Sequence, residues 1–193
     1  IDLTAHLTRT SGGAVWRYLP LAVGQGVREW LRDAIVGGSA TATLRLKGDL
    51  KRFPYADGSG VFEVKGPFKG ASLRYATDWP EFTDVAGELE FVGPRMVIRA
   101  SSARLRGVTL ADVKAEIADL GASETLLTVT GGARGPSADF LRFIETSPVG
   151  SWINHFTADM KAGGDGDLKL RLDLPLARLG ETRVDGRFRV AGN

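Results

Sequence analysis

The sequence alternates leucine with charged residues in one stretch, Leu168-Lys-Leu-Arg-Leu-Asp-Leu-Pro-Leu176. Successive side chains of a β-strand point to opposite faces, so this stretch predicts a strand with one apolar face and one charged face. Weaker versions of the alternation recur along most of the chain. A sheet built from such strands must cover its apolar face, either with protein or with a lipid.

The composition is that of a folded protein. With 193 residues the chain fits one domain or a piece of a larger one, and its 43% hydrophobic and 25% charged residues are typical of globular proteins. The formal net charge is +2 and the basic residues are interspersed with acidic ones, which gives no footprint for nucleic acid. The absence of cysteine excludes disulfides, thiolate catalysis and cysteine-based zinc sites.

Turn signals every ~8–12 residues predict an antiparallel sheet, and no βαβ rhythm is present. The predicted fold class is mainly β (α+β), with a few short amphipathic helices. We expect a single unit over residues 1–193, with both ends cut from a longer protein. Its predicted elements are a strand over 1–9, a helix over about 20–36, a strand meander over 39–131, a helical hairpin over about 137–156 and strands over 167–190.

Several local features carry specific expectations. Gly37-Gly38 should end the first helix, and Ser137 is a candidate cap for the first helix of the hairpin. Glycine and proline separate two predicted strands, Gly60–Gly66 and Ala71–Ala76, and a bulge is expected near Ser101-Ser102.

No combination of residues predicts catalysis. His6 and His155 are far apart in sequence and fit surface or hydrogen-bonded histidines, without metal-ligand spacing. Asp165 and Asp167 resemble a single copy of a calcium-binding repeat, for which a turn is the simpler interpretation. Glu88 and Glu90 fit exposed charges on one strand face rather than a glycosidase pair. We therefore expect no enzymatic activity, no metal and no cofactor.

The predicted helices are too few to cover all the strands. The remaining apolar surface would be a large exposed patch, which usually marks an interaction surface. That patch makes the identity of its cover the main functional question.

A series of local motifs resembles one known family, and the resemblance covers nearly the whole chain. The motifs are Leu44-Arg-Leu-Lys-Gly-Asp-Leu50, Phe53-Pro-Tyr55, Leu73-Arg-Tyr75, Asp78-Trp-Pro-Glu81, Asp84-Val-Ala-Gly87, Leu89-Glu-Phe91, Gly107-Val-Thr-Leu110, Val113-Lys-Ala-Glu-Ile117, Leu170-Arg-Leu-Asp-Leu-Pro-Leu176 and Val184-Asp-Gly186. Together they resemble the YhdP family of AsmA-like bacterial envelope proteins, which is related to TamB. Trp79-Pro80 and its flanks are the most specific part.

The resemblance implies an internal segment of a large protein that is anchored in the inner membrane and spans the periplasm of a Gram-negative bacterium. It also implies a long, curved sheet with a hydrophobic groove that conducts phospholipid between the inner and outer membranes. The expected partners are phospholipid acyl chains and the rest of the parent chain, stacked on both sheet ends. Membrane contact would come only through the parent protein.

The expected groove lining consists of the apolar side chains that alternate along each strand and point to one face. It comprises Leu44, Leu46, Phe62, Val64, Leu73, Tyr75, Leu89, Phe91, Met96, Ile98, Leu170, Leu172 and Leu174. Helical residues expected to plug or cap the groove are Trp30, Leu31, Phe140, Phe143, Trp152 and Phe156. In the alternative reading the helices fill the groove, and the segment is a structural or interaction module that supports outer-membrane assembly and integrity.

Overall fold

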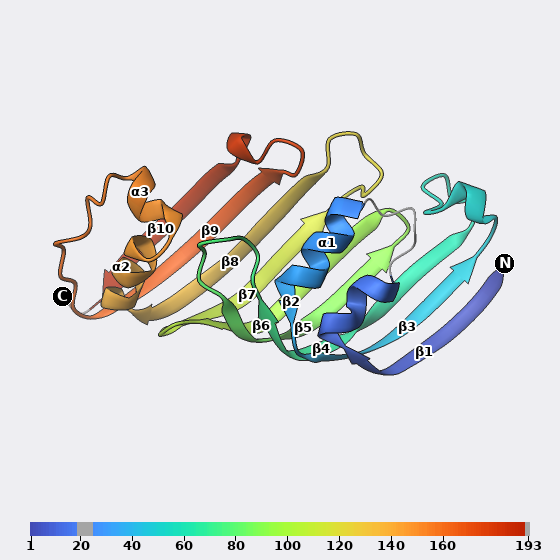
Figure 1. Cartoon of the computed structure of the whole chain (residues 1–193), viewed down its shortest axis with the longest axis horizontal. Helices are drawn as coiled ribbons and strands as arrows, with labels where there is room; N and C mark the ends of the chain where they lie inside the picture. Colours follow the sequence, from blue (N-terminus) through green and yellow to red (C-terminus); the bar gives the residue numbers. More distant parts are fainter. Residues whose placement is uncertain (19–24, 192–193) are drawn as a thin grey trace.

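The computed structural model describes residues 1–18 and 25–191, which form one long, curved antiparallel sheet with helices on one side (Figure 1). The strands are β1 (Asp2–Ser11), β2 (Ile35–Val36), β3 (Ser39–Lys47), β4 (Val61–Leu73), β5 (Phe82–Val92), β6 (Arg95–Leu105), β7 (Val108–Ile117), β8 (Leu126–Pro136), β9 (Asp165–Pro175) and β10 (Arg183–Ala191). The helices are α1 (Gln25–Ala34), α2 (Ser137–Glu145) and α3 (Pro148–Trp152), with short 3₁₀ helices η1 (Gly12–Tyr18), η2 (Leu50–Arg52) and η3 (Leu179–Glu181).

The strand order within the described residues is β1-β3-β4-β5-β6-β7-β8-β9-β10, and the two-residue β2 pairs with the end of β4. Each strand therefore lies next to its neighbour in sequence, as in a meander. The connections alternate between two ends of the strands. One end carries α1, the connection 74–81, the β6–β7 turn and α2–α3, and we call it the helical end; the other carries η2 and η3, and we call it the loop end. The prediction of a mainly β, antiparallel and curved sheet is confirmed.

The first helix is shorter than predicted. It ends at Ala34 rather than at Gly37-Gly38, because Ile35 and Val36 pair with Leu73 and Ser72 of β4. The two glycines, with φ of 77° and 82°, instead form the turn between β2 and β3. Residues 20–24 of the predicted helix lie outside the described residues.

The two strands predicted at Gly60–Gly66 and Ala71–Ala76 are one strand. β4 continues through Gly66-Pro67 because it pairs with β3 on one side and β5 on the other, and its register shifts only beyond Phe68. Tyr75 therefore lies outside the strand, in the connection 74–81. The bulge predicted near Ser101-Ser102 is confirmed, since the pairing of β5 with β6 shifts opposite these residues.

The predicted helical hairpin forms, but its second helix ends at Trp152. The prediction that Ser137 caps α2 is wrong: Pro136 is the N-cap residue, and the buried Ser137 donates its backbone N–H to Gly164. The turn predicted at Asp165 is also wrong, because Asp165 already pairs with Pro136 of β8, whereas Asp167 lies in β9 as the predicted strand over 167–190 requires. None of the helices in residues 1–18 and 25–191 has the length and apolarity needed to cross a membrane.

The buried core is small. The accessible surface is 12224 Å², roughly a third larger than the ~9,000 Å² expected for a compact protein of this length. The buried apolar residues in the described part are Ala34, Tyr55, Val97, Ala100, Ala103, Leu105, Val108 and Ile117. Most apolar side chains of the sheet are therefore only partly removed from water by the chain itself.

Candidate functional site

One face of the sheet is apolar along its whole length. Side chains of directly paired residues point to the same face, so the register defines rows that cross the strands. One row joins Ala5, Leu44, Val64, Phe91, Met96, Ile117, Leu127 and Leu174 as successive partners from β1 to β9. A second joins Leu89, Ile98, Ala115, Val129, Leu172 and Val184 from β5 to β10. We call this surface the apolar face.

The apolar face is only partly covered. In the first row Ile117 is buried and the other side chains are half-buried. Exposure rises toward β10, where Val184 is 66% and Phe188 47% exposed. No complete second layer covers this face in the described residues, unlike a typical two-layer domain.

One cover of the apolar face comes from the helical end. Phe140 of α2 packs edge-on against Phe188 of β10, with 5.0 Å between ring centroids, which places α2 over the apolar face. Figure 1 shows α1 on the same side of the sheet as α2 and α3, with the connection 74–81 lying between them. The helices therefore cover the face near one end of the strands.

Aromatic contacts join these helices through the connection 74–81. The Trp79 ring lies 6.0 Å from that of Phe143 in α2 and 5.7 Å from that of Trp152 in α3. Trp30 of α1 donates its indole N–H to the carbonyl of Tyr75 at 2.9 Å. Burial raises the pKa of the Tyr75 hydroxyl. We call Trp30, Tyr75, Trp79, Phe143 and Trp152 the aromatic bridge.

At the loop end, a shorter cover comes from the connection between β3 and β4. Phe53 packs edge-on against Phe62, with 4.8 Å between centroids, and Phe62 lies 6.5 Å from Phe91. Tyr55 is buried beside Phe53. The middle of the strands is thus left between aromatic clusters at the two ends.

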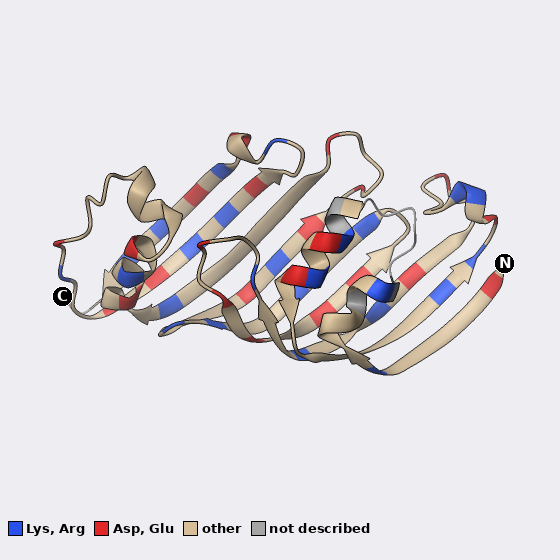
Figure 2. Ribbon diagram, viewed as in Figure 1, with Lys and Arg blue, Asp and Glu red and all other residues tan. Residues whose placement is uncertain are grey.

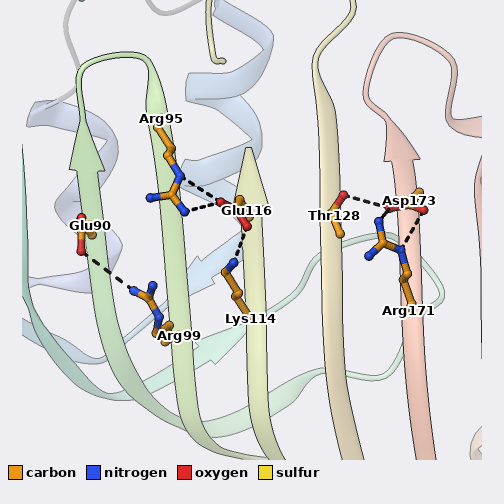
Figure 3. Close-up of polar contacts among 8 residues, drawn as sticks. All are labelled: Glu90, Arg95, Arg99, Lys114, Glu116, Thr128, Arg171 and Asp173. Atoms are coloured by element: carbon orange, nitrogen blue, oxygen red, sulfur yellow. Dashed lines mark hydrogen bonds and ion pairs between the residues drawn. The ribbon is translucent and has the colours of Figure 1, made fainter. Parts of the chain in front are cut away.

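The opposite face is charged. Acidic and basic residues lie side by side on neighbouring strands (Figure 2), and several of them pair across the strands (Figure 3). Glu116 accepts hydrogen bonds from Lys114 and Arg95, and these hold the pKa of its carboxyl at about 2. Arg171 and Thr128 bind Asp173 and lower the pKa of that carboxyl. We call this the polar face.

One apolar residue is buried on the polar face. Val97 is only 1% exposed, although its cross-strand partners are Glu90 and Glu116. The adjacent arginines of its own strand, Arg95 and Arg99, reach these same glutamates. The aliphatic parts of such long side chains can cover a valine while their charges stay in water.

Comparison with known proteins identifies the family of this chain. The sequence model of the YhdP protein family matches residues 1–193. The chain belongs to the YhdP family. The resemblance predicted from the local motifs is therefore confirmed.

A curated relative of this YhdP-family chain is the Intermembrane phospholipid transporter YhdP of Escherichia coli (strain K12). The two are 29% identical over 178 residues, which cover 91% of this chain but 14% of the relative. No solved structure matches the chain significantly.

The predicted lining residues of this YhdP-family chain lie as follows. All of them except Tyr75 are on strands and share the apolar face by register. The sequence-based list missed Ile117, Leu127, Leu168 and Phe188, although alternation marks the strands of all four. Whether these residues contact lipid stays a prediction.

The residues predicted to plug or cap the groove fall into two groups, one in contact with other aromatic or helical residues and one mostly exposed. Phe140, Phe143 and Trp30 make the contacts described above, and Leu31 is half-buried. Trp152 packs on Trp79 but is 71% exposed. Phe156 lies beyond α3 and is 73% exposed. The segment after α3 thus adds an outward apolar surface.

The histidines make only local contacts. The His155 ring lies 2.8 Å from a Glu145 carboxylate oxygen, and that of His6 lies 3.4 Å from the Thr43 hydroxyl. Hydrogen bonds from Thr157 and His155 lower the pKa of Glu145. Within the described residues no three acidic or histidine side chains come together as a candidate metal site.

Proposed function

We propose that this chain is a segment of a bridge along which phospholipids move between two membranes, with their acyl chains on the apolar face. The observation that carries the proposal is the direction of the apolar rows, which cross the strands from β1 to β10. Strand spacing of about 4.8 Å makes the path from β1 to β10 roughly 40 Å long, more than twice the ~15 Å of hydrocarbon in one leaflet. Such a surface suits movement better than one fixed pocket does.

The energetics favour a smooth lining. Moving an acyl chain out of a bilayer costs about 0.8 kcal/mol for each CH₂ exposed to water, and contact with an apolar surface removes much of that cost. Half-buried aliphatic residues in rows offer similar contacts at every position, so no single site holds the chain. The polar face keeps the other side of the sheet in water.

The proposed role includes a location and neighbours. The curated relative is named as an intermembrane transporter. We propose that the parent protein of this chain lies in the periplasm of a Gram-negative bacterium and is anchored in the inner membrane. β1 and β10 each have one partner strand in the described part, so both present free edges. We propose that other strands of the parent chain continue the sheet there.

A structural or interaction module is the second candidate. The observation in its favour is the aromatic bridge, which covers part of the apolar face with protein. In that case the apolar face would be filled by protein in the full-length molecule, and no lipid would contact it.

Site-specific photo-cross-linking in cells separates the two candidates. A photoreactive side chain is placed in the full-length protein at Leu172 or Ile98 on the apolar face, and at Thr130 or Arg171 on the polar face. The conduit predicts covalent phospholipid adducts, detected by mass spectrometry, at the first pair only. Adducts to protein alone at Leu172 and Ile98, or equal lipid adducts on both faces, would contradict it.

A further inference from the structure

A polar depression interrupts the helical end of the sheet. It has a volume of about 460 Å³ and is lined by Pro80, Glu81, Thr83, Asp84, Arg104 and Arg106. It lies where the connection 74–81 meets the β6–β7 turn, two connections without helices between those that carry α1 and α2–α3. We call it the notch.

The two arginines of the notch are not held by strong ion pairs. Arg104 lies 3.7 Å from the Asp84 carboxylate, too far for a good hydrogen bond, and both side chains are more than two-thirds exposed. Such exposed pairs contribute little stability, so Arg104 can exchange partners cheaply. Arg106 makes no hydrogen bond or ion pair with the described residues. Asp139, which approaches the adjacent Gly107, is paired with Arg142 at 2.8 Å.

The notch also contains acids. Glu81 accepts a hydrogen bond from Arg74 at 2.7 Å, and among the described residues Asp84 has only the long contact with Arg104. A neighbouring pair of guanidiniums matches the oxygens of a phosphate, because each presents several N–H donors in one plane. Carboxylates beside them match an ammonium group. The arrangement therefore fits a group that carries both charges.

The notch lies at the ends of β5 and β6, where the two faces of the sheet meet. On β6, Ala103 and Leu105 are buried on the apolar face, whereas Arg104 between them is on the opposite, polar face, beside Thr83 and Thr109 of the neighbouring strands. Arg106 follows in the β6–β7 turn. Pro80 lines the notch and directly follows Trp79 of the aromatic bridge. A lipid whose tail lies on the apolar face would reach the notch by extending its headgroup past the ends of these strands.

We propose that the notch binds the zwitterionic headgroup of a phospholipid, with the phosphodiester on Arg104 and Arg106 and the ammonium group on Glu81 and Asp84. The acyl chains would lie on the apolar face, so this inference rests on the proposed function. Because the notch is open and its charges are exposed, binding is weak and reversible, as a conduit needs.

The test uses a photoreactive side chain at Thr83 in the full-length protein, with phosphorus-labelled phosphatidylethanolamine vesicles. The double variant Arg104→Gln/Arg106→Gln should lower the lipid adduct at Thr83 by roughly tenfold, because two charge-assisted contacts are lost. The control Arg52→Gln/Arg178→Gln removes the same charge at the loop end and should leave the adduct within about twofold. An unchanged adduct in the Arg104/Arg106 variant would overturn the proposal.

Two further arms identify the ligand. Glu81→Gln/Asp84→Asn should reduce the Thr83 adduct with phosphatidylethanolamine but spare that with phosphatidylglycerol. Excess glycerophosphoethanolamine should compete for Thr83, whereas inorganic phosphate at equal concentration should not; equal competition would mean a general anion site and overturn the lipid assignment.

A second cross-linking position separates this inference from the proposed function. The adduct at Leu172 should stay within about twofold in the Arg104/Arg106 variant, because tail contacts do not need the notch. If Leu172 forms lipid adducts and Thr83 never does, the notch proposal alone fails. If Leu172 forms none in the unmodified protein, the proposed function fails as well.

Discussion

Glycine determines how closely the central strands approach. A Cβ added at Gly66 of β4 would overlap the Thr41 carbonyl oxygen of β3, and one added at Gly87 of β5 would overlap that of Arg99 in β6. Both glycines have cross-strand partners on the apolar face, Leu89 and Phe68 respectively. The backbone, rather than a side chain, therefore forms part of the apolar face at these points.

Gly66→Ala should destabilise the protein by about 2–4 kcal/mol, since the clash is with backbone that cannot move without disturbing the sheet. Denaturant unfolding of the two proteins measures the difference. Gly180→Ala is the matched control, because a Cβ there meets no atom within 4 Å, and it should change stability by less than about 0.5 kcal/mol. Equal effects of the two substitutions would show that the close approach of β3 and β4 does not matter.

The charges of the polar face have a predictable pH dependence. Because Lys114 and Arg95 hold the pKa of Glu116 at about 2, below its ordinary 4.5, this carboxylate stabilises the folded state fully above pH 4.5. The contribution falls away as the pH drops from 4.5 toward 2, when the carboxylate becomes protonated in both states. Urea midpoints should therefore favour the unmodified protein over Glu116→Gln at pH 7, with a smaller difference at pH 3.

Glu88→Gln controls for the loss of one negative charge on the same face. Its difference from the unmodified protein should change less between pH 7 and pH 3 than that of Glu116→Gln. A Glu116→Gln effect that stays constant over this range would mean that the contacts with Lys114 and Arg95 do not lower the pKa.

At the scale of elements, the aromatic bridge connects three separate connections of the meander. α1 lies between β1 and β3, the connection 74–81 between β4 and β5, and α2–α3 between β8 and β9. Trp79 is the central residue, because it contacts Tyr75, Phe143 and Trp152. The position of α3 over the sheet therefore depends on a tryptophan about 70 residues earlier in sequence.

Trp79→Ala should release α3. Losing its ring contacts with Phe143 and Trp152 removes about 1–3 kcal/mol from local stability, so amide hydrogen exchange in α3 should accelerate while that in β6 stays unchanged. Phe156→Ala serves as the control, since Phe156 is 73% exposed, and it should alter exchange little. Unchanged α3 exchange in Trp79→Ala would show that other contacts hold this helix.

These elements also show which parts of the fold follow from sequence. Alternation predicts β9 and the parity of Leu170, Leu172 and Leu174 correctly, because a strand with a half-buried face keeps a strict period of two. Local signals failed where pairing between distant segments decided the outcome. Ile35 joined β2 instead of the helix, and Gly66-Pro67 did not end β4, since both segments gain partners from distant strands.

In the candidate site, too, local sequence signals were predictive and contacts between distant segments were not. The apolar side of each strand was predictable, but the aromatic bridge was not, since it depends on contacts between residues 45 to 73 positions apart on separate connections. The notch was missed for the same reason. Its two sides, Glu81–Asp84 and Arg104–Arg106, come together only when β5 pairs with β6.

At the scale of the whole molecule, the two faces of the sheet differ in how they are covered. On the polar face, charged side chains form ion pairs with one another. The side chains of the apolar face are half-buried in the middle of the strands and increasingly exposed toward β10. Exposed apolar surface of this extent is rare in isolated monomers and marks an interaction surface. The two proposed covers, lipid and protein, predict different responses to a charge placed on it.

Leu172→Asp makes that comparison at a position between Val129 and Val184 on the apolar face. Because Val184 is 66% exposed, an aspartate nearby can reach water, and we expect the fold to survive with a loss of about 1–3 kcal/mol while phospholipid transport between the membranes falls. Thermal unfolding of the full-length protein and transport of labelled phospholipid in cells measure the two effects separately.

The control Thr130→Asp places the same charge on the polar face, between Lys114 and Arg171, and should preserve both fold and transport. If Leu172→Asp unfolds the protein, the apolar face is covered by protein and the structural candidate is favoured. If it leaves both the fold and the transport rate unchanged, lipid does not pass over this strand, because a charge in the path of an acyl chain would raise the barrier to its movement.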